Sequence, residues 1–210
     1  MDRIAAVFDV DRTLIQGFTE RLFFRCLVRH GLLPKPRALS YLGTVALNPK
    51  ERFRNKTYLK GLPVAETLQV AGKCYREKIS PRLSAVGVAC VRQHQAQGHD
   101  IVLLTGSLAF LTLPLKEELG AGWLIATEVA QTGNSFTGEI NGLHPRGENK
   151  LRLLLELARD HGLDLNRSFA YGDHLQDLHL FHRIGHPVAV NPSWRLKRLA
   201  RRHQWPIRLF

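Results

Sequence analysis

Short apolar runs alternate with longer amphipathic stretches along most of this 210-residue chain, and this alternation limits the folds open to it. Five runs are apolar enough to be strands buried on both faces: residues 4–8, 101–104, 124–126, 169–171 and 188–190. Helical spacing follows in residues 108–119, 150–161, 175–184 and 193–202. Strands that alternate with helices in this way predict an α/β fold, a doubly wound parallel sheet with right-handed crossovers.

Residues 15–98 interrupt this alternation, because no convincing strand occurs between the first and second apolar runs. Helical patterns occupy residues 19–30, 63–79 and 82–98. We therefore expect a core domain of residues 1–14 and 99–210, with a helical cap inserted at 15–98. A turn at Gly133-Asn134 between strand-like flanks predicts a β-hairpin within residues 127–142, appended to the core.

Composition places the chain among ordinary globular proteins, with 44% apolar and 23% charged residues. Cys26, Cys74 and Cys90 are far apart and lack the spacing of a zinc site, so we expect buried thiols in a reducing compartment. The apolar run near the N-terminus is too short for a signal peptide, and no run approaches the length of a membrane span. These features predict a cytoplasmic protein.

Basic residues are concentrated in two segments of this chain, whose net charge is +12. Residues 21–60 carry ten Lys and Arg against the single acid Glu51, and the part beyond Asp177 has seven basic residues and no acid. Such segments attract phosphate esters, anionic lipid or nucleic acid, and charge alone does not choose among these. Within the first segment, residues 38–47 are nearly apolar. They are compatible with shallow membrane contact, although packing within the cap is the favoured interpretation.

The first candidate site is the pair Asp9 and Asp11, which directly follows the first apolar run. At the carboxyl end of a strand, alternating carboxylates point into the crevice where open α/β sheets bind ligands. One carboxylate of such a pair can act as a nucleophile or metal ligand while the other transfers protons. An isolated Asp-x-Asp is weak support, because it also occurs in hydrophilic turns.

Three further polar motifs follow later strands. Thr105-Gly106-Ser107 offers a hydroxyl and turn amides to a phosphate oxygen. Lys150 opens a helix, where the helix dipole disfavours a cation that has no anion to hold. Asp173 and Asp177 lie four residues apart at a turn into a helix, a spacing that suits a hard cation.

The ordered set Asp-x-Asp-x-Thr, Thr-Gly-Ser, Lys and Gly-Asp-x-x-x-Asp at strand ends resembles the haloacid dehalogenase superfamily of phosphohydrolases. The resemblance covers nearly the whole chain, and the helical insertion looks like that of the phosphoserine-phosphatase-like branch. Subfamily IB is indicated by a further set of motifs: Tyr58-Leu59-Lys60-Gly61, Phe136-Thr137-Gly138, Ala170-Tyr171-Gly172-Asp173, residues 185–192 and Trp205-Pro206.

This resemblance implies catalytic roles. Asp9 would attack phosphorus and form an aspartyl-phosphate, and Asp11 would protonate the leaving alkoxide and then deprotonate water. Thr105 and Lys150 would stabilise the charge on the phosphoryl oxygens.

It also implies a Mg²⁺ cofactor, held by Asp9, the backbone carbonyl of Asp11 and Asp173. Asp177 would orient a metal-bound water or Lys150. Further contacts with phosphate or substrate would come from four residues: Thr13, Gly106, Ser107 and His174.

Three positions depart from the family pattern. Arg12 stands where glycine is commoner, which should not remove function because this side chain can point away from the carboxylates. His174 replaces a small residue, so it could touch substrate, although a solvated or packed histidine is favoured. Phosphoserine phosphatases have a glutamate just past the first motif that reads the substrate amine. Here the nearest acid is Glu20, which puts phosphoserine specificity in doubt.

The sequence thus predicts a Mg²⁺-dependent phosphomonoesterase acting on a small anionic phosphate ester. One alternative is a lipid-phosphate phosphatase of the lysophosphatidate or phosphatidylglycerophosphate type, at a membrane surface. A different class is a basic protein that binds nucleic acid or membrane and carries a vestigial phosphatase core. For the enzyme we expect a small phosphorylated substrate, possible peripheral contact with anionic membrane and no specific nucleic acid.

Overall fold

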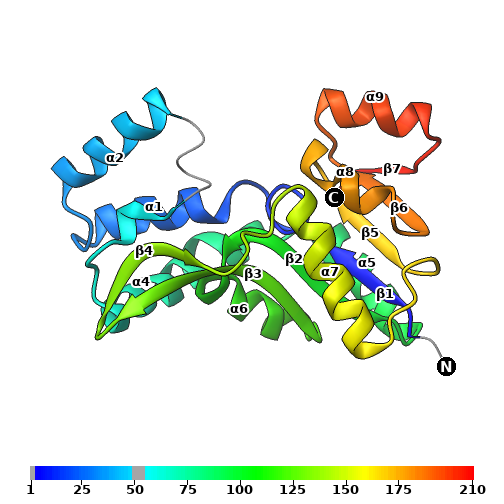
Figure 1. The fold of residues 1–210 in the computed structure, drawn as a ribbon, viewed down its shortest axis with the longest axis horizontal. Helices are drawn as coiled ribbons and strands as arrows, with labels where there is room; N and C mark the ends of the chain where they lie inside the picture. The colour runs from blue at the N-terminus through cyan, green and yellow to red at the C-terminus, as the bar shows by residue number, and fades with distance from the viewer. Residues whose placement is uncertain (1–2, 49–54) are drawn as a thin grey trace.

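The computed structural model describes residues 3–48 and 55–210, and a seven-stranded sheet lies at its centre (Figure 1). The strands occur in the order β4-β3-β2-β1-β5-β6-β7. Their bounds are Ala5–Phe8 (β1), Asp100–Leu108 (β2), Trp123–Thr132 (β3), Ser135–Asn141 (β4), Phe169–Gly172 (β5), His186–Val190 (β6) and Ile207–Arg208 (β7). Among these strands only β3 and β4 pair antiparallel, as a hairpin. The predicted α/β fold with an added hairpin is confirmed.

Helices cover both faces of the sheet because its central strands are apolar on both sides. In β1, Ala6 and Phe8 belong to one buried cluster, and Ala5 and Val7 belong to the other. The first cluster takes in α5 (Ala85–Ala96) and α6 (Ala109–Leu119). The second takes in α7 (Glu148–His161), α8 (Leu178–Phe181) and α9 (Trp194–Arg202). This two-sided packing is what the continuous apolar runs predicted.

The cap segment is helical and lies at one end of the molecule. It contains α1 (Thr19–Arg29), α2 (Lys35–Leu47), the turn η1 (Thr57–Leu59) and α4 (Val64–Cys74). The β3–β4 hairpin runs beside it (Figure 1), where Lys56 N donates to Gly138 O at 2.7 Å and Gly61 N donates to Phe136 O at 2.7 Å. The hairpin therefore extends the sheet toward the cap.

The cap boundary at 15–98 stays a prediction, and one helix within it contacts the core. His94 on α5 bonds the hydroxyl of Tyr171 through Nε2 at 2.8 Å and lies edge-on to Phe8. Residues 75–82 connect α4 to α5 as a π-helical turn, η2 (Tyr75–Ile79), and a 3₁₀ turn, η3 (Ser80–Arg82). The segment predicted as a helix over 63–79 is therefore α-helical only as far as Cys74.

The other differences from the sequence prediction are local. Residues 175–184 form a 3₁₀ turn, η4 (Leu175–Asp177), followed by the short α8, because His174 and Asp177 cap each other's backbone there. The two-residue β7 carries no recognisable pattern. Cys26, Cys74 and Cys90 are buried and free, as predicted. No helix in the described residues is long and apolar enough to cross a bilayer.

Candidate active site

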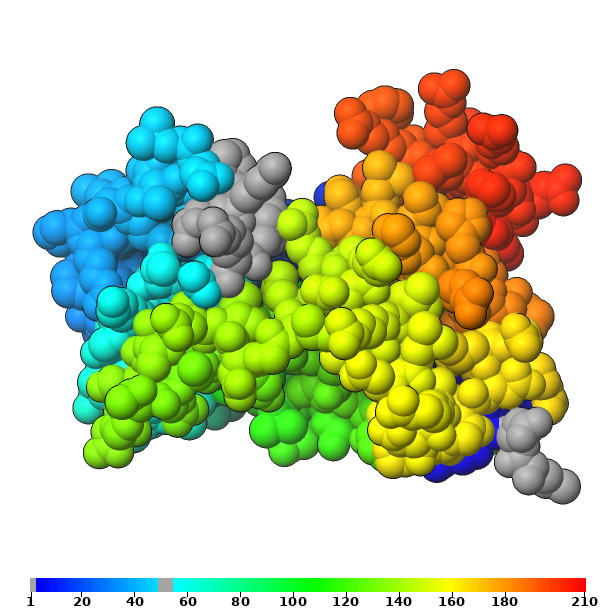
Figure 2. Space-filling view, in the orientation of Figure 1, coloured from blue at the N-terminus to red at the C-terminus, as the bar shows by residue number. Residues whose placement is uncertain are grey.

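A cavity of about 450 Å³ opens between the cap and the carboxyl ends of the core strands. In Figure 2, α1 and α2 (blue) and α8 and α9 (orange and red) rise on either side of a hollow. The first and second motifs lie at the ends of β1 and β2, and the last motif lies at the end of β5. These three strands are neighbours in the sheet. Motifs that are far apart in the sequence therefore meet at the position where the strand order reverses direction, which is where open α/β sheets bind ligands.

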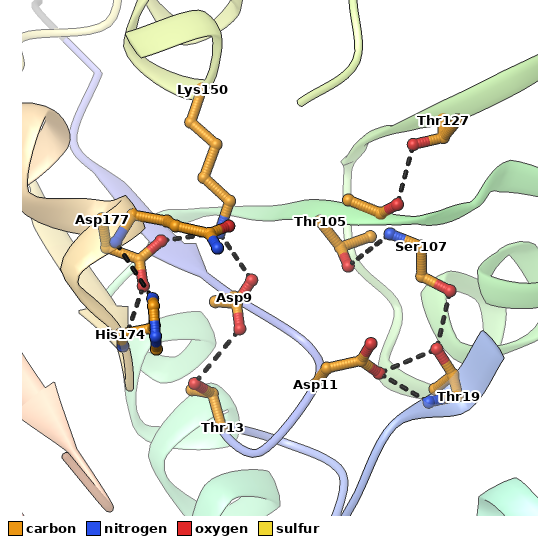
Figure 3. Close-up of polar contacts among 12 residues, drawn as sticks. Asp9, Asp11, Thr13, Thr19, Thr105, Ser107, Thr127, Lys150, His174 and Asp177 are labelled. Atoms are coloured by element: carbon orange, nitrogen blue, oxygen red, sulfur yellow. Dashed lines mark hydrogen bonds and ion pairs between the residues drawn. The ribbon is translucent and has the colours of Figure 1, made fainter. Parts of the chain in front are cut away.

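Asp9, Lys150 and Asp177 form a buried ion-pair network at the centre of this site, in which both carboxylates contact the lysine (Figure 3). Lys150 Nζ donates to Asp9 Oδ1 and to Asp177 Oδ1, each at 2.6 Å. The Lys150 side chain is 5% exposed, so both bonds are shielded from water. The predicted lysine at the start of α7 therefore holds two of the predicted carboxylates.

Asp11 is held by the start of α1. Its Oδ1 accepts from Thr19 N at 2.8 Å and from Thr19 Oγ1 at 2.7 Å. The Thr19 hydroxyl in turn lies 2.6 Å from Ser107 Oγ. Ser107 N donates to Thr105 Oγ1 at 3.1 Å, so the Thr-Gly-Ser motif of β2 and Asp11 belong to one hydrogen-bonded network.

Asp173 also lines the cavity, and Arg12 contacts it directly. Arg12 Nε lies 3.3 Å from Asp173 Oδ2. The side chain of Arg12 therefore does not point away from the carboxylates, as the sequence had allowed it to do. Its side chain is 40% exposed, and its backbone has a positive φ of 64°.

The remaining predicted residues fall into two groups. His174, Gly106 and Ser107 line the cavity. Thr13 does not line it: this buried residue donates to Asp9 Oδ2 at 3.4 Å, which places it behind the carboxylate. Gly172 precedes Asp173, and a Cβ there would come within 2.5 Å of Asp177 Oδ2, so only glycine leaves room for that carboxylate.

Burial shifts the pKa values of the clustered acids. It raises the pKa of Asp9 to about 8, with Lys150 opposing the rise and Asp177 adding to it. Burial likewise raises the pKa of Asp173 to about 7, and that of Asp11 to about 6 against the two bonds from Thr19. Burial lowers the pKa of Lys150, but Asp177 and Asp9 outweigh it and hold the lysine charged.

The donor set fits a small hard cation. Asp9, Asp11, Asp173 and Asp177 surround the cavity. Burial raises the pKa values of Asp9, Asp11 and Asp173, so a cation that offsets their charge would be favoured there. Within residues 3–48 and 55–210, no three His, Cys, Asp or Glu side chains cluster as a closed metal site. Mg²⁺ does not need such a cluster, because it is usually bound by one or two carboxylates and keeps several waters.

Sequence reasoning missed several residues of the cavity. Thr127 donates to Gly106 O at 2.8 Å and contacts His144 Nδ1 at 2.7 Å, and His144 also lines the cavity. Lys56 is 2% exposed and donates to Glu20 Oε2 at 2.7 Å. Lys56 is thus buried in an ion pair, while Lys50, Arg52 and Arg54 of the same basic segment lie outside the described residues.

The chain belongs to the haloacid dehalogenase-like hydrolase family, whose family model matches residues 6–182. The resemblance stated from the motifs, including that to phosphoserine-phosphatase-like members, is confirmed, and so is the prediction of a phosphatase.

Three curated relatives indicate the range of proteins similar to this chain. It is 31% identical to a phosphoserine phosphatase of Mycobacterium tuberculosis, over 98% of this chain and 70% of that protein. It is 30% identical to an "inhibition of morphological differentiation protein" of Streptomyces azureus, over 99% and 78%. It is 26% identical to a histidinol-phosphatase of Neisseria meningitidis, over 96% of both proteins.

Two solved structures support the fold. A protein of unknown function from Bordetella pertussis Tohama I has a TM-score of 0.88 and 26% identity, over 99% of this chain and 98% of that one. A phospho-aspartyl intermediate analogue of phosphoserine phosphatase has a TM-score of 0.70 and 18% identity, over 100% and 94%. At that identity, the second match bears on the fold alone.

Proposed function

We propose that this chain is a Mg²⁺-dependent phosphomonoesterase that acts on a small anionic phosphate ester through an aspartyl-phosphate on Asp9. The observation that carries the proposal is the position of Asp9 in the cavity. Lys150 occupies its Oδ1 at 2.6 Å, whereas among the described residues Oδ2 has only the long contact from Thr13 at 3.4 Å. Oδ2 is therefore the oxygen that attacks phosphorus.

Asp11 is the proton carrier in this proposal. Thr19 occupies its Oδ1 twice, which fixes the carboxyl group and leaves Oδ2 to exchange a proton. When Asp9 Oδ2 bonds to phosphorus, the ester bond breaks and the leaving oxygen takes a proton from Asp11. Water then attacks the phosphorus of the aspartyl-phosphate, Asp11 takes a proton from that water, and phosphate and free Asp9 result. A pKa of about 6 suits both directions of transfer near neutral pH.

Lys150, Thr105 and the turn at Gly106 and Ser107 face the phosphoryl group in this scheme. Lys150 supplies positive charge, and Thr105 Oγ1 and the turn amides supply hydrogen bonds to the oxygens on which charge accumulates. Asp177 positions Lys150 through its 2.6 Å bond. His174 lines the cavity beside Asp173, where it contacts substrate.

Mg²⁺ would be held by Asp9, the backbone carbonyl of Asp11 and Asp173. When bound, it supplies the charge that offsets repulsion between these carboxylates and a phosphate dianion.

Release of inorganic phosphate from a panel of esters tests the proposal. The panel includes phosphoserine and histidinol phosphate, the esters in the names of two relatives, and ethyl phosphate as a minimal substrate. We expect Mg²⁺-dependent release, and a peptide containing Asp9 that carries one phosphoryl group after acid quench. Release that persists in excess chelator, or a phosphoryl group on another residue, would contradict the proposal.

We also propose that the chain works in the cytoplasm and makes peripheral contact with anionic membrane through α9. The free thiols suit a reducing compartment. On α9, Leu196 and Ala200 are buried against the core, so its basic side chains face solvent, and Trp194 is 70% exposed. An exposed basic helix with a tryptophan is suited to an anionic lipid surface.

A further inference from the structure

The cavity extends well beyond the catalytic carboxylates. Its volume of about 450 Å³ lies in the range that takes a whole small ligand, so a phosphate group alone does not fill it. One end is polar and holds Asp9, Asp11 and Lys150. The other end is formed by the cap, and it receives the alcohol part of any ester whose phosphate lies at Asp9.

Three aromatic rings from three separate cap segments line that second end. Phe24 belongs to α1, Tyr41 to α2 and Tyr58 to η1. The ring centroids lie 5.5 Å apart for Phe24 and Tyr41, 5.4 Å for Phe24 and Tyr58, and 5.1 Å for Tyr41 and Tyr58. Phe24 and Tyr41 are half-buried, so part of each ring is open to the cavity. These mutually contacting rings, two pairs of them tilted and one edge-to-face, form an aromatic wall against which a further ring could pack.

The acidic group beside this wall is already paired. Glu20 accepts from Lys56 Nζ at 2.7 Å through Oε2 and from Tyr58 OH at 2.9 Å through Oε1. The ammonium group of an amino-acid substrate would meet a carboxylate whose charge Lys56 has neutralised. The cap end therefore does not favour a small zwitterion.

We propose that Phe24, Tyr41 and Tyr58 form an aromatic subsite that binds a phosphate ester whose alcohol carries a planar ring. The inference rests on the proposed phosphomonoesterase function and deepens it by naming the substrate class.

A ring fits this end better than an extended alkyl chain does. Leu42 and Val45 also line the cavity on the cap side, but charged side chains line the same cavity around them: Glu20, Arg21, Lys56 and Arg146. A long chain would extend past these few apolar side chains and lie against the charges, which costs free energy. A compact ring contacts the three aromatic side chains and does not extend to the charged ones.

Matched substrates test the subsite. The assay measures kcat/KM for phenylalkyl phosphates with two, three or four linker carbons against cyclohexylalkyl phosphates with the same linkers. Ethyl phosphate and n-octyl phosphate complete the set. The two ring types have similar size and apolar surface, and only the first is planar and aromatic. We expect the best phenylalkyl ester to exceed its cyclohexyl partner by about 3- to 10-fold and ethyl phosphate by about tenfold or more.

Variants of one side chain link that preference to the wall. Tyr41→Leu keeps apolar bulk but removes the ring, so the phenyl-to-cyclohexyl ratio should fall toward one. Tyr41→Phe should keep the ratio. Leu39→Ala, at an exposed position on the same helix outside the cavity lining, should change neither the ratio nor the rate. The ratio is measured within one protein sample, so partial misfolding does not alter it.

The possible failures are distinguishable. Equal rates for phenyl and cyclohexyl esters overturn the aromatic subsite while leaving the phosphomonoesterase in place. A preference for n-octyl phosphate also overturns it, in favour of a lipid-like substrate. A ratio that survives in Tyr41→Leu overturns the assignment of the wall. Failure to hydrolyse any ester, ethyl phosphate included, overturns the proposed function and the inference with it.

Discussion

At the residue scale, the site is defined by carboxylates that are close together and short of positive charge. Asp9, Asp173 and Asp177 lie near one buried lysine and one half-exposed arginine. Each carboxylate therefore has a specific partner: Lys150 for Asp9 and Asp177, and Arg12 for Asp173. Substitutions that remove one member should have effects that depend on which partner remains.

Exchange of the two motif carboxylates for amides should separate nucleophile from proton carrier. Asp9→Asn should reduce phosphate release below detection, because an amide oxygen is a poor nucleophile. Asp11→Asn should slow hydrolysis of an alkyl ester by about 10²- to 10⁴-fold, since the leaving alkoxide then lacks its acid. Steady-state phosphate release measures both effects. An Asp11→Asn enzyme that keeps most of its activity on an alkyl phosphate would show that another group carries the proton.

Arg12 combines a strained backbone with an ion pair, and two substitutions separate them. Its φ of 64° lies in the left-handed region that favours glycine. Arg12→Gly and Arg12→Ala both remove the guanidinium from Asp173, but only glycine relieves the strain. The free energy of unfolding of Arg12→Gly should exceed that of Arg12→Ala by about 1 kcal/mol in denaturant titrations.

The same pair of variants tests whether Arg12 competes with a cation for Asp173. Both should reach half-maximal activity at a lower Mg²⁺ concentration than the unaltered chain, and by the same factor. A difference between them would assign the effect to the backbone, and no change in either would mean that Arg12 and the cation do not compete.

The individual site residues differ in how well they could be predicted from the sequence. Asp9, Asp11, Thr105, Lys150 and Asp173 stand at strand ends in a recognisable order, so their meeting could be predicted from topology. The Glu20 and Lys56 pair joins residues 36 positions apart in the cap, where no sheet register determines which residues come into contact. Arg12 has a positive φ and contacts Asp173, and sequence patterns encode neither feature for a non-glycine residue.

At the scale of elements, the buried strands were the most predictable feature. A run such as Ala5–Phe8 is apolar at every position, and this pattern predicts a strand that is covered on both faces. Strand length was less predictable, because β3 continues from a half-buried run into the hairpin, whose last residues are exposed. The helix over 175–184 was overestimated, since the polar capping of Asp177 and His174 interrupts its first turn.

Helix α9 offers a test of membrane contact that leaves the active site alone. Arg198, Arg201 and Arg202 are exposed on it and lie outside the cavity lining. Changing all three to Gln should make the free energy of binding to phosphatidylglycerol vesicles, measured by co-sedimentation, less favourable by about 1 kcal/mol per residue. The same change should leave kcat/KM on a soluble ester unchanged.

Two controls accompany that test. Phosphatidylcholine vesicles should bind neither protein, and Arg152→Gln on α7 should bind anionic vesicles like the unaltered chain. Equal binding of the triple variant and the unaltered chain would remove α9 as the contact surface. Stronger retention on nucleic acid than on vesicles would favour the binding-protein alternative.

At the scale of the whole molecule, the cleft arises where the cap lies over the carboxyl ends of β1, β2 and β5. This arrangement explains why the cavity has a polar end from the core and an aromatic end from the cap. The sheet topology could be predicted because alternating strands and helices allow few right-handed arrangements. The aromatic wall could not, because Phe24, Tyr41 and Tyr58 come from segments whose packing depends on tertiary contacts alone.

One face of the sheet carries a buried histidine whose protonation links the stability of the fold to pH. His94 on α5 is 5% exposed and contacts Phe8, Phe169 and Tyr171. Burial lowers its pKa from 6.5 to about 4, and the nearby His99 and Arg208 add to the effect. Below pH 6.5 the unfolded chain therefore binds a proton that the folded chain refuses until about pH 4.

The free energy of unfolding should accordingly fall as pH drops through that window. His94 should contribute up to about 3 kcal/mol of this loss between pH 6.5 and 4, at no more than about 1.4 kcal/mol per pH unit. Urea titrations of the unaltered chain and His94→Gln measure it, because the difference between the two curves cancels the other titrating groups. Above pH 7.5 the two curves should run parallel, since the histidine is neutral in both states. Equal slopes between pH 6 and 4.5 would contradict the assignment. The buried acids of the active site could not account for the loss, because their raised pKa values favour the folded state as the pH falls.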